Sequence, residues 1–212
     1  MIEILLNKYG PDQLSYYVED LDEAAERFHK LFGAGPFIKM GPLRFQKCVY
    51  RGKEIDPEFE IALGMWGEIE VELVHKISGE PYLFDEKGYG FNHINVIVDD
   101  YDEAIEQFAK YGLEPGMTMI SSDMPIAYID AMDVLGHNIE IHGPSSSATS
   151  LCRAAKANWD GKETWMDIRE VMAAMKHQAS NPQITREGFS RRPSLVVQRW
   201  VSQAFRVTGR SG

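Results

Sequence analysis

The sequence has no apolar run approaching about 18 residues, and its opening, MIEILLNKYG, has neither a basic start nor a long apolar stretch. A membrane span needs such a run and a secretory signal needs both features, so we expect neither. Cysteine is also scarce, because only Cys48 and Cys152 occur and they share no motif. This usage is typical of reduced, cytoplasmic proteins, in which both residues would be small buried side chains.

Positive charge is scarce in the first 143 residues, which contain 11 Lys and Arg against 27 Asp and Glu. The remaining residues reverse this balance, with 11 against 5. The acidic part repels phosphate backbones, so nucleic acid is not an expected partner. We expect the basic part to contact the acidic part of its own chain or of a second copy, which favours a homodimer.

One segment occurs twice. VEDLDEAAERF (18–28) and VDDYDEAIEQF (98–108) lie 80 residues apart and are identical at seven of eleven positions. Each copy follows an alternating segment that predicts a strand, QLSYYV or HINVIV, and places Asp20 or Asp100 at the N-cap of an amphipathic helix. Further strands are expected at 44–52, 59–67 and 68–76, and again at 117–121, 126–132 and 138–143.

These elements predict an α+β protein made of two β-α-β-β-β modules, residues 1–85 and 86–143. Their sheets should lie side by side as a cup-shaped mixed sheet with helices outside. Residues 144–212 form a C-terminal extension, with helices expected at 151–159 and 164–177 and a partly mobile stretch after 180. We expect the two helices near the cup mouth or at a subunit interface.

Strand alternation decides which side chains face the cup. If the apolar positions of the first and last strands of each module pack under the helices, the intervening positions face inward. One face then carries an amide, an imidazole and two carboxylates at symmetric places: Gln13, Glu72, His93 and Glu140. Such a set suits one divalent metal ion, whether Zn, Ni, Co, Mn or Mg. Three further inward candidates for binding a small-molecule substrate are Tyr17, Asn95 and His142.

The paired modules, with QLSYYVEDLDEAAERFHKLFGAGPF and FNHINVIVDDYDEAIEQF, resemble the vicinal oxygen chelate superfamily. This superfamily includes glyoxalases, methylmalonyl-CoA epimerases, bleomycin-resistance proteins and extradiol dioxygenases. The resemblance covers roughly residues 10–143, and its most specific parts are His93 and the segment GHNIEIHG around Glu140. The family's ligand positions correspond to Gln13, Glu72, His93 and Glu140, as in glutathione-dependent glyoxalases, whereas epimerases more often have His in place of Gln13.

The resemblance implies a metal-dependent lyase or isomerase, or an epimerase, that removes a proton next to a metal-bound carbonyl, with Glu140 as the base and Glu72 as its counterpart. In glutathione-dependent relatives, Arg residues that hold glutathione occupy the positions of Tyr17 and Tyr89. A small, non-glutathione, more apolar or aromatic substrate is therefore expected. Two alternatives stay open: a non-catalytic small-molecule-binding protein of the resistance type and, third, an extradiol-type dioxygenase, which needs two His where only His93 occupies a ligand position.

Overall fold

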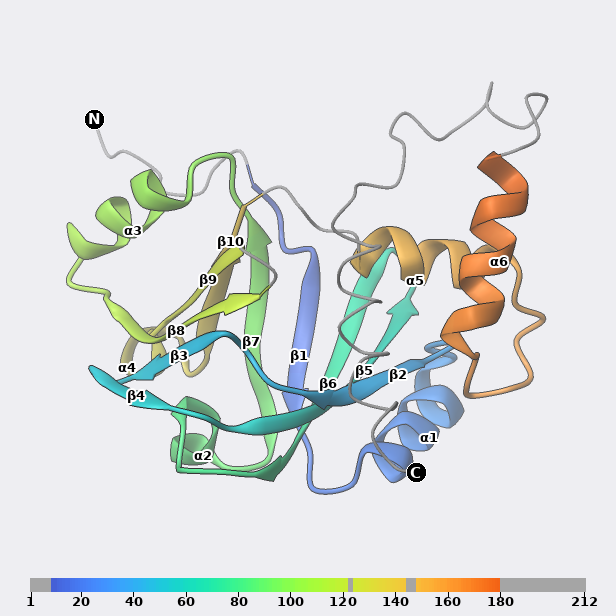
Figure 1. Ribbon diagram of the computed structural model, residues 1–212, viewed down its shortest axis with the longest axis horizontal. Helices are drawn as coiled ribbons and strands as arrows, with labels where there is room; N and C mark the ends of the chain where they lie inside the picture. The colour runs from blue at the N-terminus through green and yellow to red at the C-terminus, as the bar shows by residue number, and fades with distance from the viewer. Residues whose placement is uncertain (1–8, 122–123, 144–147, 180–212) are drawn as a thin grey trace.

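The computed structural model describes residues 9–121, 124–143 and 148–179 (Figure 1). The elements of the first half are β1 (Gln13–Tyr17), α1 (Leu21–Phe32), β2 (Ile38–Leu43), β3 (Lys47–Tyr50), β4 (Lys53–Ile55), β5 (Glu58–Trp66) and β6 (Ile69–Ser78). A short helix, α2 (Leu83–Lys87), leads to the second half: β7 (Gly90–Ile97), α3 (Tyr101–Ala109), β8 (Pro115–Ser121), β9 (Met124–Ile129), α4 (Met132–Leu135) and β10 (Asn138–His142). The extension contributes α5 (Ala148–Ala157) and α6 (Ile168–Ala179).

Both copies of the repeated segment form helices that begin in the same way. The Asp20 carboxylate accepts a hydrogen bond from the backbone N–H of Glu23 at 2.8 Å, and that of Asp100 from Glu103 at 2.9 Å. Each bond satisfies one of the amides that a helix start leaves without a partner. The two predicted N-caps are confirmed.

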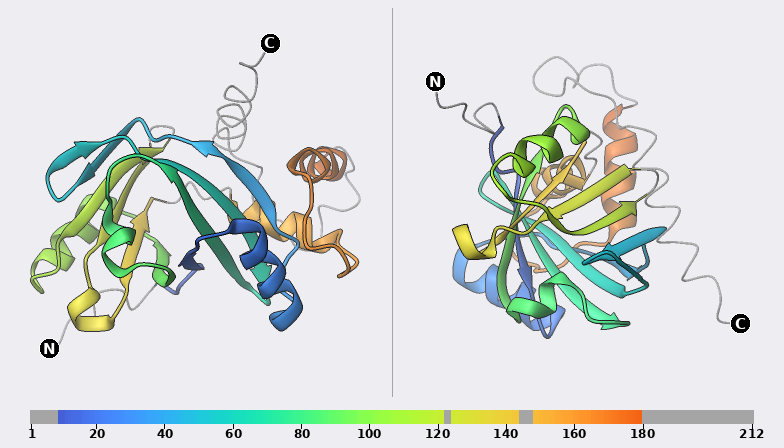
Figure 2. Two further views of the ribbon diagram at one scale, coloured as in Figure 1. Left: turned by 90° about the horizontal axis from the view of Figure 1, so that it is seen from below. Right: turned by 90° about the vertical axis from the view of Figure 1, so that its left-hand side faces the viewer.

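The ten strands within the described residues form one mixed sheet in the order β2-β5-β6-β1-β7-β10-β9-β8-β3-β4. β1 and β7 are antiparallel neighbours at its centre, with Gln13 opposite Asn95 and Ser15 opposite His93. The closing strands β6 and β10 each run parallel to the first strand of their own module. The sheet curls into a cup with α1 and α3 on its convex side, as Figure 2 shows. The predicted α+β class and cup are confirmed.

The first half differs from the predicted strand order in one respect. The strand expected at 44–52 was assigned to the sheet of the first module, but β3 pairs with β8 of the second module, with Val49 opposite Thr118. The strand that pairs with β5 in the first module is β2 instead. Arg51, in the turn of the β3–β4 hairpin, forms ion pairs with Glu86 at 2.8 Å and Asp130 at 2.5 Å. Contacts with distant charged residues therefore fix a hairpin that crosses between the modules.

Side-chain alternation follows the prediction. Val71 and Leu73 pack in the cluster under α1, and Ile139 and Ile141 pack in the cluster under α3. The opposite face of the sheet carries a separate, larger cluster of aromatic, aliphatic and Met side chains. The inward positions therefore lie on the concave side of the cup.

Helix α5 of the extension belongs to this concave cluster. Leu151 and Ala155 are buried in it together with Ile61 and Met65 of β5, and Val171 of α6 joins them. The two helices expected in the extension are confirmed, with shifted bounds. The stretch after 180 lies outside the described residues, and the expected homodimer involves a second chain, so light scattering of the full chain is its test.

Within the described ranges, no helix combines the length and the apolar character that crossing a membrane requires.

Candidate metal centre and pocket

Three of the four predicted ligands converge on the concave face. Glu72 of β6, His93 of β7 and Glu140 of β10 offer ligand atoms that all lie within 4.8 Å of one another. His93 Nε2 is 3.5 Å from Glu72 Oε2 and 3.2 Å from Glu140 Oε2, without meeting hydrogen-bond geometry with either. The imidazole is completely buried. Two carboxylates and one imidazole nitrogen thus face a common point.

The orientation of His93 is fixed from behind by the preceding residue. Its Nδ1 lies 3.2 Å from Asn92 Oδ1, and Asn138 Nδ2 donates to the same oxygen at 3.4 Å. Because Oδ1 is an acceptor, Nδ1 must carry the hydrogen. Nε2 then presents a lone pair to the two carboxylates when the ring is neutral, which is the form that binds metals.

Without a cation among them, the carboxylates favour a charged imidazole. Burial alone would lower the pKa of His93, but the proximity and charge of Glu140 and Glu72 outweigh it and raise the pKa to about 9. A divalent cation that uses Nε2 must displace this proton. The site is therefore a place where positive charge is strongly favoured, whether as a proton or as a metal ion.

The fourth predicted ligand, Gln13 of β1, lies on the same concave face of the sheet. Its Nε2 donates a 2.5 Å hydrogen bond to Glu70 Oε1, and its Oε1 is buried without a hydrogen-bond partner in the described part of the chain. Gln13 pairs with Asn95 across β1 and β7, and Asn95 in turn contacts Glu140. The oxygen is thus an unsatisfied acceptor on the face that carries the other ligands.

The two carboxylates of the centre are held unequally. Glu140 accepts from Tyr128 OH at 3.1 Å through Oε1 and from Asn95 Nδ2 at 3.0 Å through Oε2. Glu72 accepts from Ser15 Oγ at 2.8 Å through Oε2. Both oxygens of Glu140 are therefore anchored, whereas only one oxygen of Glu72 is.

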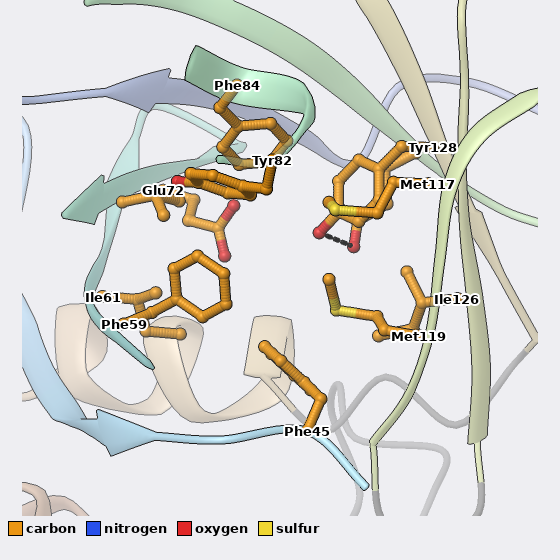
Figure 3. A pocket seen from close by; sticks show the side chains of 12 residues that line it. Phe45, Phe59, Ile61, Glu72, Tyr82, Phe84, Met117, Met119, Ile126 and Tyr128 are labelled. Atoms are coloured by element: carbon orange, nitrogen blue, oxygen red, sulfur yellow. Dashed lines mark hydrogen bonds between the residues drawn. The ribbon is translucent and has the colours of Figure 1, made fainter. Parts of the chain in front are cut away.

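An apolar pocket opens directly onto Glu72 and Glu140 (Figure 3). The space between its walls is about 470 Å³ when the open solvent at its mouth is counted. One wall comes from β5 and β6, the opposite wall from β8 and β9, and the Glu72 carboxylate points into the space between them. The lining is otherwise aromatic, aliphatic or Met: Phe45, Phe59, Ile61, Val74, Tyr82, Phe84, Met117, Met119, Ile126 and Tyr128. No Lys, Arg or His is among the described residues that line it.

The three predicted substrate-binding residues lie around the pocket but do not line it. Tyr17 is buried, and its hydroxyl donates to Asp85 at 2.8 Å. Asn95 donates a hydrogen bond to Glu140, as described above. His142, at the end of β10, places Nδ1 2.9 Å from the Gly143 carbonyl. Their proposed contacts with a substrate stay a prediction.

Sequence reasoning missed several residues that shape the centre. Strand parity predicts that Ser15 points inward, but it assigned the residue no role. Asn92 could have been identified because it is adjacent to His93. Tyr128 and Glu70 lie on strands that were predicted, but no local pattern distinguishes them from other inward side chains. Their roles depend on which strands become neighbours.

The chemistry of the donors fits a divalent metal ion. Gln13 Oε1 and His93 Nε2 are buried atoms that make no hydrogen bond within the described residues, and buried polar atoms are normally satisfied. Glu72 and Glu140 add two carboxylates within reach of the imidazole. Mixed oxygen and nitrogen ligands of this kind suit first-row divalent metals.

A family model described as the glyoxalase/bleomycin resistance protein/dioxygenase superfamily matches residues 12–128. The match spans more than half of the chain, so the protein belongs to this superfamily. Gln13, Glu72 and His93 lie within the matched range, and Glu140 lies beyond it. A search of curated proteins found no match.

Similar solved structures include a methylmalonyl-CoA epimerase from Mycobacterium tuberculosis, with 20% identity, covering 66% of this chain and 91% of that chain at a TM-score of 0.42. A hypothetical protein from Bacillus halodurans C-125 has 16% identity and covers 67% and 99%, with a TM-score of 0.45. A mutant 4-hydroxymandelate synthase from Streptomyces coelicolor has 14% identity and covers 64% and 48%, with a TM-score of 0.39. None of these similarities assigns a reaction to this chain.

The contact between His93 and Asn92 generates a prediction. Replacing Asn92 with Leu removes the acceptor that holds Nδ1, so the affinity for Ni²⁺ should fall about 10- to 100-fold, the usual effect of losing such a partner. Isothermal titration of the full chain measures the change. Asn92→Asp retains an acceptor and serves as the matched variant; equal affinities for Asn92→Leu and wild type would contradict the assigned role.

Proposed function

We propose that the protein is a metal-dependent lyase or isomerase, or an epimerase, that moves a proton next to a carbonyl group of a small, non-glutathione substrate. The observation that supports it is the cluster of Glu72, Glu140 and His93, whose two carboxylates line an apolar pocket. Gln13 Oε1 and His93 Nε2 are buried atoms without a hydrogen-bond partner among the described residues. When bound, a divalent ion supplies positive charge that stabilises the oxyanion left by proton removal. Gln13, Glu72, His93 and Glu140 would hold it.

The unequal anchoring of the carboxylates favours different tasks for them. Glu140 would have to give up hydrogen bonds from Tyr128 and Asn95 to turn, whereas Glu72 has one such bond and points into the pocket. We therefore propose Glu72 as the first proton acceptor and Glu140 as its counterpart, the reverse of the order suggested by the sequence. The change rests on hydrogen bonding, which determines how freely each carboxylate moves.

The pocket favours a compact, uncharged, apolar or aromatic substrate. Its lining offers ring faces and Met side chains but no cation to pair with a phosphate or carboxylate. Tyr17 and Tyr89 hold positions where glutathione-dependent relatives carry Arg, and their rings lie against each other with centroids 5.0 Å apart. Lys76, which lies over the ring of Tyr82, is paired with Asp85.

The first prediction from the proposed function concerns the metal itself. The purified full chain should bind about one divalent ion tightly, and His93→Ala should abolish its retention while circular dichroism shows a folded protein. Elemental analysis after metal repletion and gel filtration measures both. A wild type that keeps no metal would reject the centre and favour the non-catalytic binding protein, for which the apolar lining alone would suffice.

A second prediction separates this protein from glutathione-dependent glyoxalases. With methylglyoxal and glutathione, kcat/KM should stay well below about 10⁴ M⁻¹s⁻¹, the lower end of ordinary enzyme efficiency, because the described residues that line the pocket include no cation to hold the carboxylates of glutathione. The metal-loaded protein is assayed for the thioester product. Turnover at or above that efficiency would disprove the proposed substrate class.

A third prediction tests the role of Glu72 as the first proton acceptor. Small apolar ketones and aldehydes are incubated with metal-loaded protein in D₂O, and NMR detects exchange of the proton beside the carbonyl. For any compound that exchanges, Glu72→Gln should slow the exchange about 10²- to 10⁴-fold. Glu60→Gln is the matched control. Glu60 alternates on β5 with Phe59 and Ile61, which line the pocket, so its side chain points to the other face of the sheet. Exchange at the wild-type rate in Glu72→Gln would refute its role as proton acceptor.

A further inference from the structure

Behind the candidate ligand Gln13 lies a second buried carboxylate that the proposed chemistry does not use. Glu70 of β6 is 1% exposed and sits opposite Gln13 in the parallel register of β1 and β6. It accepts the 2.5 Å hydrogen bond from Gln13 Nε2. Burying an ionised carboxylate so completely is costly unless hydrogen-bond donors or positive charge compensate for the lost water.

The Glu70 contact determines which end of the Gln13 amide faces the centre. Gln13 Nε2 donates to Glu70 Oε1, so the NH₂ end of the Gln13 amide points to Glu70. The amide is planar, and its oxygen is therefore turned away from Glu70. This is the oxygen that is buried without a hydrogen-bond partner among the described residues.

Glu70 is reached from its other side by the C-terminal extension. Cys152 of α5 is fully buried, and its thiol lies beside the Glu70 carboxylate, whose Oε2 makes no hydrogen bond within the described residues. Burial raises the pKa of Glu70, and although the contacts with Gln13 and Cys152 favour the charged form, the pKa stays raised at about 7. Helix α5 thus contributes a polar contact to the cup as well as apolar packing against β5.

In the second module the candidate ligand is also supported by neighbouring side chains, but these are different residues. Asn138 of β10 lies opposite His93, as Glu70 lies opposite Gln13, and Asn138 contacts Asn92, which holds His93 Nδ1. In each half a residue of the closing strand therefore supports the candidate ligand on the first strand. In the first half that support extends to α5.

We propose that Glu70 and Cys152 are positioning residues that hold the Gln13 amide with its oxygen directed to the metal centre, so that helix α5 of the extension is a functional part of that centre. This inference rests on the metal site proposed above. It assigns a role to a segment that the duplicated modules do not account for.

The experiment is a calorimetric titration of the full-length chain with Ni²⁺, together with thermal unfolding of each metal-free variant. Glu70→Met removes the acceptor with little change of volume and should weaken Ni²⁺ binding by about 10-fold or more. Cys152→Ala should weaken it in the same direction but by less. Cys152→Ser keeps a donor and should bind Ni²⁺ close to wild type.

Cys48→Ala is the matched control, because Cys48 is also buried in the concave cluster but lies on β3. It should lower the unfolding temperature without changing the affinity for Ni²⁺. If Glu70→Met does not fold, the comparison of Cys152→Ala with Cys152→Ser carries the test, since the two differ in the donor.

The possible failures are distinguishable. A wild type that binds no Ni²⁺ would overturn the metal centre and this inference together. A wild type that binds, with Cys152→Ala and Glu70→Met binding equally tightly, would overturn only the positioning role. Unchanged affinity with a lowered unfolding temperature in both variants would likewise show that these contacts are purely structural.

Discussion

Three carboxylates gathered on the concave face, two buried and one part-buried, are the constraint on which the rest of this structure depends. Glu70, Glu72 and Glu140 face the same interior, and like charges in such a medium are tolerated only beside positive charge or hydrogen-bond donors. His93 supplies at most one positive charge, and the remaining support comes from Gln13, Ser15, Asn95, Tyr128 and Cys152. A divalent ion would complete this balance more fully than a proton on the imidazole.

The duplicated modules provide the geometry that this balance needs. β1 and β7 are antiparallel neighbours, and β6 and β10 flank them, so four adjacent strands present their inward side chains to one place. The apolar positions of the same strands pack under α1 and α3, which fixes the parity of the inward ones. Phe45, which precedes β3, and Phe84 of α2 then help to enclose the apolar pocket beside the carboxylates.

The sequence predicted the features that local rules determine. Helix caps at Asp20 and Asp100, and the inward parity of Glu72 and Glu140, follow from repeats and from alternation with period two. The pairing of β3 with β8 could not be predicted in this way, because pairing between distant strands has no local signal. For the same reason the hydrogen bonds of Tyr17 with Asp85 and of Tyr128 with Glu140 emerge only when the sheet order is known.

The most direct measurement of the central claim is an anomalous difference map from crystals of the full chain grown with Ni²⁺ and recorded at the nickel absorption edge. We expect one strong peak bounded by Gln13 Oε1, His93 Nε2 and the carboxylates of Glu72 and Glu140, at the end of the apolar pocket. A map with no peak there, while Ni²⁺ occupies only surface carboxylates, would contradict the assignment of this buried cluster as a metal centre.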